Sequence, residues 1–400
     1  MQQRRTAGAS GARWGFLWAW SFALAMLVAC GQGRKQDVVD GPIVIESATD
    51  LAQLRGVRRI VGGIELAGEA IDGEVELADL EQVDRLAVER TRISKLSLPA
   101  LRSAGRIRVV DNVTLEELAL PSLEEVTGEL QVTAQPKLRS LSWPRLRWVS
   151  RLDVCGGLAS LALPALRRVT VLLCDSPDAL LTELSLPRLE YAETLFLQDL
   201  AIATRLSLPA LTEIGGTAAI GGVHLEQIEL PRLRVVQKLS GFSPRAVLAW
   251  DLPALQSASE LLLRAEGPIV VRLDSLLQVG ELMLAAGQGA KEASVLEAPR
   301  LARAGRLALW GEFEQARFPR LREVGSFVAT VRQRVAFPEL ASAGSLQLRW
   351  TGATDVEAEK LIVAGEVELV TAYAPCDPAE LFPHLREADR VVHLQADLCL

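Results

Sequence analysis

The side chains that could carry out chemistry are few in this sequence, and their spacing favours no catalytic site. The three histidines, His224, His384 and His393, lie far apart, and no cysteine or acidic cluster frames any of them. A catalytic histidine normally works with a second polar group within hydrogen-bonding reach. We therefore expect no catalytic residue, no metal site and no bound cofactor.

Four aspartates are the best candidates for an enzyme, namely Asp111, Asp153, Asp175 and Asp199. Enzymes built on β-helices act on polysaccharides with carboxylates that cluster on adjacent coils. Counted from the proline of the repeat described below, the four stand at offsets of 12, 9, 11 and 12 residues, so they share no register. A β-helical lyase or hydrolase stays open as an alternative, and carboxylates that converge in a lateral cleft would distinguish it.

The cysteines fit an exported protein better than a metal or redox site, because the sequence contains no C-x-x-C pair. Cys155 and Cys174 are 19 residues apart and Cys376 and Cys399 are 23 apart, each close to one repeat. Coils stacked about 4.8 Å apart bring such residues within disulfide range. We predict a bridge between Cys376 and Cys399. Cys155 and Cys174 form either a bridge, which export favours, or two stacked thiols.

The N-terminus has the order of a bacterial lipoprotein signal. Arginines precede an apolar run from Trp14 to Ala29, and Leu27-Val28-Ala29-Cys30 resembles a lipobox with the lipid on Cys30. We expect a signal peptide over residues 1–29 and a lipidated tether over 30–41. Gly31 in place of Asp resembles sorting to the outer membrane, on its periplasmic or cell-surface face. A spanning helix that stays in place is the alternative, although the run is short for one.

The charge balance argues against nucleic acid as a partner. The formal net charge is −7, and residues 1–29 hold three Arg and no acid, so the remainder carries −10. Hydrophobic residues make up 49% of the chain and aromatic residues only 5%. We expect a large core built mostly from Leu, Val and Ala.

A motif of the form Leu-x-Leu-Pro-x-Leu recurs through most of the chain. Residues 96–105 read LSLPALRSAG, and the first intervals between motif prolines are 22, 23, 20, 23, 22, 22 and 22 residues. Proline cannot donate a ladder hydrogen bond, so it marks a corner between strands. The motif prolines are Pro99, Pro121, Pro144, Pro164, Pro187, Pro209, Pro231, Pro253, Pro299, Pro319, Pro338 and Pro383.

A glycine often stands six residues after the motif proline, as at Gly105, Gly280 and Gly305, and a second alternating strand follows it, as in Leu307-x-Leu309. We expect these glycines to form a turn with positive φ. Alternation turns the leucines to one face, which only a stacked neighbour can bury. The sequence therefore predicts an all-β-type solenoid, a right-handed parallel β-helix of about 15 leucine-rich coils of 19–23 residues, as a single domain over residues 42–400.

Residues 43–66, IVIESATDLAQLRGVRRIVGGIEL, and the later coils resemble receptor L domains, the leucine-rich ligand-binding domains of insulin- and epidermal-growth-factor-type receptors. The single asparagine, Asn112, argues against the asparagine ladder of horseshoe repeats. The resemblance implies an extracellular recognition scaffold and names no ligand. We expect a capping segment over residues 42–66 and a C-terminal cap over 374–400.

Aromatic and arginine side chains near the ends of the second strands form a possible binding face: Trp310, Trp350, Arg264, Arg349 and Phe242. Exposed aromatics beside arginine suit protein or glycan recognition, whereas buried ones would only fill gaps under loops. We expect a non-catalytic protein of the cell envelope that recognises or scaffolds an unidentified protein or glycan. A passive structural spacer is a further alternative.

Overall fold

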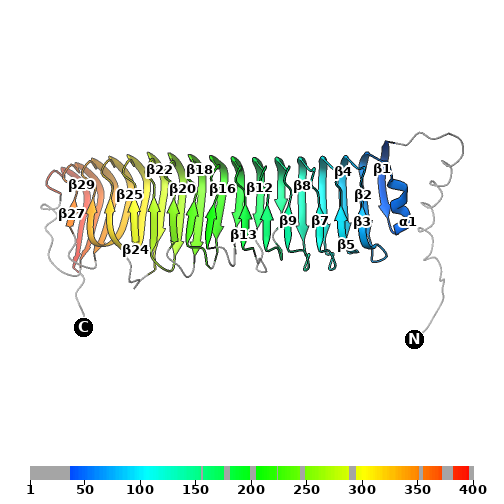
Figure 1. Ribbon diagram of the computed structural model, residues 1–400. Helices are drawn as coiled ribbons and strands as arrows, with labels where there is room; N and C mark the ends of the chain where they lie inside the picture. Colours follow the sequence, from blue (N-terminus) through cyan, green and yellow to red (C-terminus); the bar gives the residue numbers. More distant parts are fainter. Residues whose placement is uncertain are drawn as a thin grey trace, which may run out of the picture. The chain divides into compact units, whose positions relative to one another are not determined.

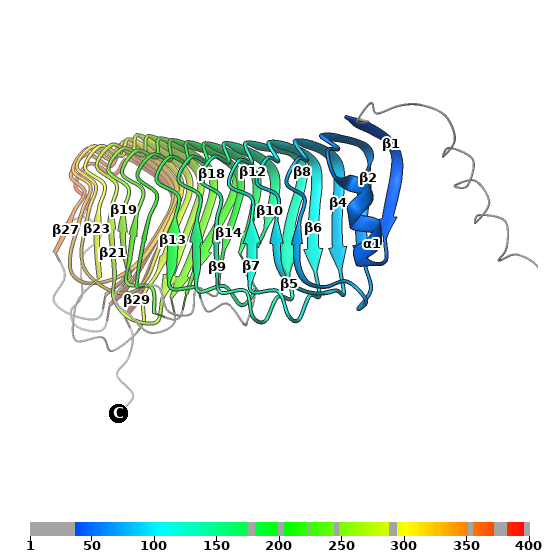
Figure 2. The ribbon, with the colours of Figure 1, turned by 45° about the vertical axis from the view of Figure 1, so that its right-hand side comes forward.

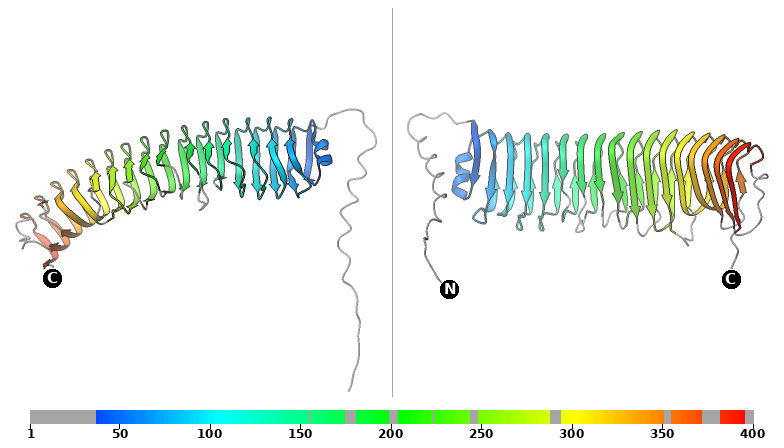
Figure 3. Two further views of the ribbon diagram at one scale, coloured as in Figure 1. Left: turned by 60° about the horizontal axis from the view of Figure 1, so that its bottom comes forward. Right: turned by 180° about the vertical axis from the view of Figure 1, so that it is seen from behind.

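A computed structural model describes residues 37–395 except 155, 175–180, 199–203, 223, 244–247, 288–293, 351–354 and 372–381. It is a parallel β-solenoid of about 14 turns, which confirms the predicted fold class. Strands stack in chain order from β1 to β29 (Figure 1), and the further views keep that order (Figure 3). The predicted signal peptide, the predicted lipid site at Cys30, most of the predicted tether, and Cys155, Cys376 and Cys399 lie outside the described residues.

Most coils consist of a long strand followed by a short one. The long strands of successive coils pair with one another and form one continuous parallel sheet. β24 and β25 run through both parts of their coils, because their second halves pair with β23 and β27. The sheet begins with β1 (Val38–Ile45), which pairs with β2. The long strands are β2 (Arg59–Ala67), β4 (Gln82–Glu89), β6 (Ser103–Val110), β8 (Glu125–Thr133), β10 (Trp148–Asp153), β12 (Arg168–Cys174), β14 (Tyr191–Leu197), β16 (Glu213–Gly221), β18 (Val235–Ser243), β20 (Ser257–Ala265), β22 (Gln278–Ala285), β24 (Arg303–Arg317), β25 (Glu323–Ala336), β26 (Ser342–Trp350), β28 (Val363–Thr371) and β29 (Glu387–Gln395).

The short strands carry the Leu-x-Leu part of the motif and stack on one another in the same parallel sense. They are β3 (Asp72–Glu76), β5 (Arg92–Ser97), β7 (Glu117–Ala119), β9 (Ser140–Ser142), β11 (Ser160–Ala162), β13 (Glu183–Ser185), β15 (Arg205–Ser207), β17 (Gln227–Glu229), β19 (Leu248–Asp251), β21 (Ile269–Arg272), β23 (Ser294–Glu297) and β27 (Asp355–Glu357). The short helix α1 (Ala48–Leu51) and the 3₁₀ turn η1 (Ala52–Leu54) lie beside β1 and β2 at the N-terminal end (Figure 2). Among the described residues, no helix is long and apolar enough to cross a bilayer.

The motif proline stands second in a four-residue turn, where its fixed φ fits and no N–H is needed. In one coil the amide of Leu101 donates to the carbonyl oxygen of Leu98 at 3.3 Å, and the turn from Leu208 to Leu211 repeats that distance. The leucines on either side point inward and are buried. The proline therefore marks a corner, as the sequence predicts.

The glycines six residues past the proline do not have the positive φ that the sequence suggested. They lie inside the long strands, at a position without a partner in the β-ladder. Ala304 pairs with Val324 and Arg306 pairs with Ser326, but Gly305 between them is unpaired. A Cβ on Gly305 would stand 2.4 Å from the carbonyl oxygen of Gly280 on the neighbouring coil. Glycine at these positions lets the backbones of successive coils approach closely where the strands bend, whereas some other coils carry a side chain there, as at Ser259.

The core follows the predicted alternation and is mostly Leu, Val and Ala. Leu307 is 0% exposed, while Arg306 beside it points outward and pairs with Glu281. Aromatic rings are a local addition near the C-terminal end, where Phe327 packs edge-on against Phe318 and Phe337 with ring centroids 6.0 and 5.5 Å apart.

A small polar network is buried in the N-terminal coils, where most of the core is apolar. The Oδ1 atom of Asn112 accepts hydrogen bonds from the amide and the hydroxyl of Thr91, at 3.0 and 2.8 Å. Its Nδ2 atom donates to the carbonyl oxygens of Val88 and Val110, at 3.0 and 3.1 Å. The single asparagine therefore ties the backbones of two successive coils together.

Candidate functional site

A long groove of about 820 Å³ runs across seven long strands, β16, β18, β20, β22, β24, β25 and β26. At about 4.8 Å per strand, this corresponds to a length of about 30 Å along the solenoid axis. It follows the bend described above, so glycines such as Gly280, Gly305 and Gly325 leave its floor without side chains. The groove is therefore a consequence of the same glycines that let the coils stack closely.

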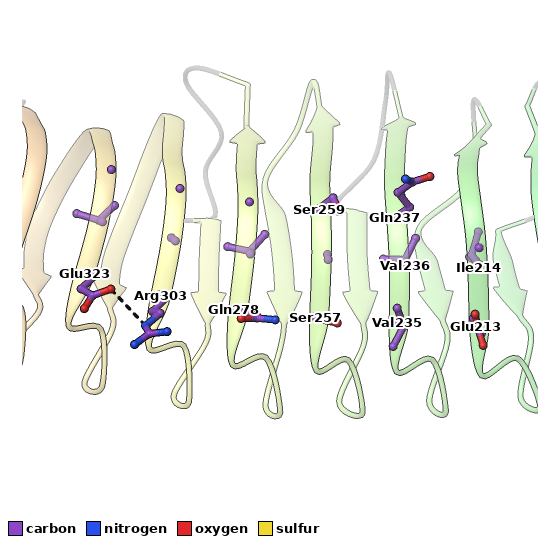
Figure 4. A pocket seen from close by; sticks show the side chains of 18 of the residues that line it. Glu213, Ile214, Val235, Val236, Gln237, Ser257, Ser259, Gln278, Arg303 and Glu323 are labelled. Atoms are coloured by element: carbon purple, nitrogen blue, oxygen red, sulfur yellow. Dashed lines mark ion pairs between the residues drawn. The ribbon is translucent and has the colours of Figure 1, made fainter.

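The groove is lined by buried apolar side chains such as Val236 and by uncharged polar side chains that face solvent (Figure 4). Gln237, Ser257, Ser259 and Gln278 supply amide and hydroxyl groups that both donate and accept hydrogen bonds. Exposed Val235 adds apolar contact surface. Such a lining suits a polar, uncharged ligand with many hydroxyl or amide groups.

The charged side chains of the groove do not form an acid–base pair. Arg303 and Glu323 bind each other, with Nε and Oε2 3.2 Å apart (Figure 4). The other carboxylate, Glu213, lies on β16, and four long strands separate it from Glu323 on β25. The described carboxylates of this groove therefore do not converge as a β-helical hydrolase or lyase would need.

The groove is closed at its N-terminal end by two side chains of β14. The hydroxyl of Tyr191 donates a hydrogen bond to the Oε2 atom of Glu193, and this bond raises the pKa of Tyr191 above its ordinary value. A Cβ on Gly215 would stand 2.3 Å from that carboxylate oxygen and 2.6 Å from the tyrosine hydroxyl. Tyr191 and Glu193 therefore occupy the space above Gly215, and the groove extends from there toward β26.

The predicted aromatic and arginine residues come together at the other end of the same strands. The ladder places Phe242 beside Arg264, Arg264 beside Ala285 and Ala285 beside Trp310. Phe242 and Trp310 are 42% and 44% exposed, and the guanidinium carbon of Arg264 lies 5.6 Å from the centre of the Phe242 ring. These side chains therefore do not fill gaps in the core.

Two predicted members of that face lie farther toward the C-terminus. Arg349 is exposed and pairs with Thr330 on β25, so it continues the row past Trp310. Trp350 is the last residue of β26, and its side chain lies outside the described part of the structure. The row and the groove therefore flank the same outward face of the long-strand sheet.

The remaining chemical candidates stay apart. His224 and His384 are exposed on distant coils, and no group of three His, Cys, Asp or Glu in the described ranges is arranged to hold a metal ion. Asp111 occupies an exposed corner, and Asp153 is half-buried on β10, where burial raises its pKa. Asp175 and Asp199 lie outside the described residues.

Cys174 is buried at the end of β12, and its predicted pairing with Cys155 stays a prediction.

Sequence reasoning missed the groove itself. The polar residues of the groove belong to no motif, and only the stacking in register aligns Gln237 with Ser259 and pairs Ser257 with Gln278. The spacing of the glycines was the one available signal, because a row without side chains leaves a channel. No known protein family matches the chain, and a comparison with curated proteins finds no relative.

Proposed function

We propose that this protein is a non-catalytic recognition protein of the bacterial cell envelope. It is anchored by a lipid on Cys30 and binds an extended glycan or protein segment along the outward face of its long-strand sheet. The observation that supports this most is the groove across seven coils, because a channel parallel to the stacking axis fits a linear chain. A globular partner would instead need a broad patch.

The lining of the groove favours a glycan over a peptide. The groove runs across the strands, so a peptide in it could not add to the sheet by main-chain pairing. Hydroxyl and amide side chains at successive coils instead offer repeated hydrogen bonds to the repeated hydroxyls of a sugar polymer. The row of Phe242, Arg264 and Trp310 supplies a second contact line on the same face.

The test is binding of the lipid-free chain to a glycan panel and to envelope extracts. Ser259→Trp fills the groove from an exposed position and should reduce binding at least about tenfold, which corresponds to about 1.4 kcal/mol. Thr127→Trp, at the exposed equivalent position on β8 outside the groove, is the matched control. Equal binding by both variants would contradict the groove, and the absence of any ligand would favour the passive spacer.

The anchor has a separate test. Cys30→Ala should abolish labelling with a lipid precursor and release or stall the protein during export. Labelling that persists in the variant would contradict the lipoprotein assignment without affecting the groove. Shortening of a bound polymer during incubation would instead support the carbohydrate-active enzyme.

A further inference from the structure

Ion pairs in this solenoid follow one rule. Every ion pair between described side chains joins residues 19 to 25 positions apart, on neighbouring coils. Stacking at about 4.8 Å brings side chains of one row close enough for opposite charges to attract and like charges to repel. Alternating signs along a row therefore stabilise the stack without any partner.

Five arginines gather on three successive coils, and four of them have no such partner among the described side chains. We call them the arginine corner: Arg145, Arg147, Arg167, Arg168 and Arg188. All five are exposed, at the proline turns that lead into β10, β12 and β14. Within the described part of the chain, the one ion pair among them joins Arg167 Nη1 to Glu190 Oε1 at 3.8 Å. A chain with a net charge of −7 thus concentrates positive charge on one edge.

The backbone fixes how these arginines are stacked. The amide of Arg167 donates to the carbonyl oxygen of Arg147 at 2.9 Å, so the two occupy the same position on adjacent coils. Arg168 pairs with Trp148 one step farther along the ladder. Two like charges in direct succession repel each other, which an anionic ligand would offset.

The other two arginines frame a gap. Arg145 and Arg188 each follow a motif proline, two coils apart, and the equivalent residue of the coil between them is Ala165. Two coil steps correspond to about 10 Å, and an alanine side chain leaves the space between the guanidinium groups open. An anionic group placed over Ala165 would lie within reach of arginines on both sides.

We propose that the arginine corner binds a linear polyanion that carries phosphate or carboxylate groups and lies along the solenoid axis. Guanidinium groups bind both of these anions through two parallel hydrogen bonds. A thin chain fits better than a flat anionic surface, because the half-exposed Glu124 and Glu190 lie beside the arginines and would meet such a surface. The site is separate from the groove, since Tyr191 and Glu193 close the groove before the corner begins, and it does not depend on what the groove binds.

The test uses the full chain with long-chain polyphosphate and polygalacturonate as probes and neutral dextran as the blank. The variant Arg145→Gln/Arg147→Gln/Arg188→Gln should bind both polyanions at least about tenfold more weakly than the wild type, with a weaker dependence on salt. The control Arg58→Gln/Arg92→Gln/Arg272→Gln removes the same charge from arginines in cross-coil ion pairs. It should change the affinity less than twofold.

Three results would overturn the proposal: no polyanion binding by the wild type at low salt, equal weakening in both triple variants, or binding to anionic lipid vesicles without binding to free polymers. If polyanion binding is lost in Ser259→Trp instead, the polymer lies in the groove, and the corner is not its site. If the triple variant has a lower melting temperature than the wild type, the single variant Arg188→Gln gives the same comparison, because it changes only one exposed turn residue. Its affinity should fall more than that of Arg272→Gln.

Discussion

The coils from β4 to β10 and those from β16 to β26 share one backbone plan but differ in what they present to solvent. On the outward face of the first group, Glu129 lies between Arg106 and Arg151, with N–O distances of 3.9 and 3.3 Å. At the bend of the second group, glycines and small polar residues leave the groove open. The long strands of the first group therefore cover this face with paired charges, whereas the second group leaves part of it open to a ligand beside its own ion pairs.

This difference shows which positions of a coil are constrained and which are free. The inward leucines, the proline turn and the close approach at the bend are needed in both groups for the coils to stack. The outward positions on the strands are not, because solvent accepts many side chains there. Recognition can therefore change from coil to coil without a change of fold.

The largest effect should come from the inward row that both groups share. Leu130→Asp on β8 and Leu307→Asp on β24 each bury a charge at a position that is 0% exposed, so each should lower the free energy of unfolding by at least about 4 kcal/mol. Urea unfolding measures this. Arg306→Asp, next to Leu307 but outward, should cost far less. Equal losses for Leu307→Asp and Arg306→Asp would show that the inward and outward faces are misassigned.

The two ends of the stack should depend on different devices. Helix α1 lies against the N-terminal coil, and a bridge between Cys376 and Cys399 is predicted for the other end. Cys399→Ser should lower the free energy of unfolding by about 3 kcal/mol in the chain-entropy model of disulfides. It should also increase trimming by proteases from the C-terminus. Mass mapping of the non-reduced exported protein tests the bridge, and a free thiol at either cysteine would refute it.

The polar network around Asn112 is buried in the N-terminal group. Asn112→Ala would leave the amide of Thr91 and two carbonyl oxygens without their partner, so it should cost about 1–3 kcal/mol. Asp111→Asn changes an exposed neighbour whose positive φ asparagine tolerates, and it should cost no more than about 0.5 kcal/mol. Thermal unfolding of the two variants distinguishes them. Equal melting temperatures would show that the hydrogen bonds of Asn112 do not stabilise the fold.

The bend glycines belong mostly to the groove group. Gly305→Ala should lower the free energy of unfolding by about 1–3 kcal/mol, because the added methyl group would overlap the carbonyl oxygen of Gly280. Ser259, at the equivalent position of β20, already has a Cβ, so Ser259→Ala should leave the free energy of unfolding nearly unchanged. A neutral Gly305→Ala variant would mean that glycine serves the ligand rather than the stacking.

The smallest effect concerns Asp153 of the N-terminal group. Burial raises its folded-state pKa above the ordinary value of 3.8, Glu129 adds to the shift, and Arg151 opposes it. A raised pKa means that the ionised form disfavours the folded state, so the stability from protonated Asp153 is present at low pH and lost as pH rises through the raised pKa. Asp153→Asn should therefore raise the melting temperature slightly at pH 7 and not at pH 3. A lower melting temperature at pH 7 would contradict this assignment.

The sequence predicts what repeats and leaves out what depends on register. Leu-x-Leu-Pro-x-Leu defines the corner, the inward face and the parallel stacking, and the row of Phe242, Arg264 and Trp310 follows from strand offsets alone. The role of Gly305 was misread, since close approach to the next coil has the same sequence signal as positive φ. The buried position of Asn112 and the alignment of Gln237 with Ser259 depend on how coils stack, which spacing does not specify to a single residue.

Footprinting of the chain with a ligand isolated from envelope extracts tests the central claim most directly. Hydrogen exchange of backbone amides, read strand by strand, compares the two groups of coils within one molecule. Protection on binding should be confined to β16 to β26, at their bends and along the row of Phe242, Arg264 and Trp310, and it should be lost in Ser259→Trp. Protection centred on β4 to β8, or spread evenly along the stack, would contradict it.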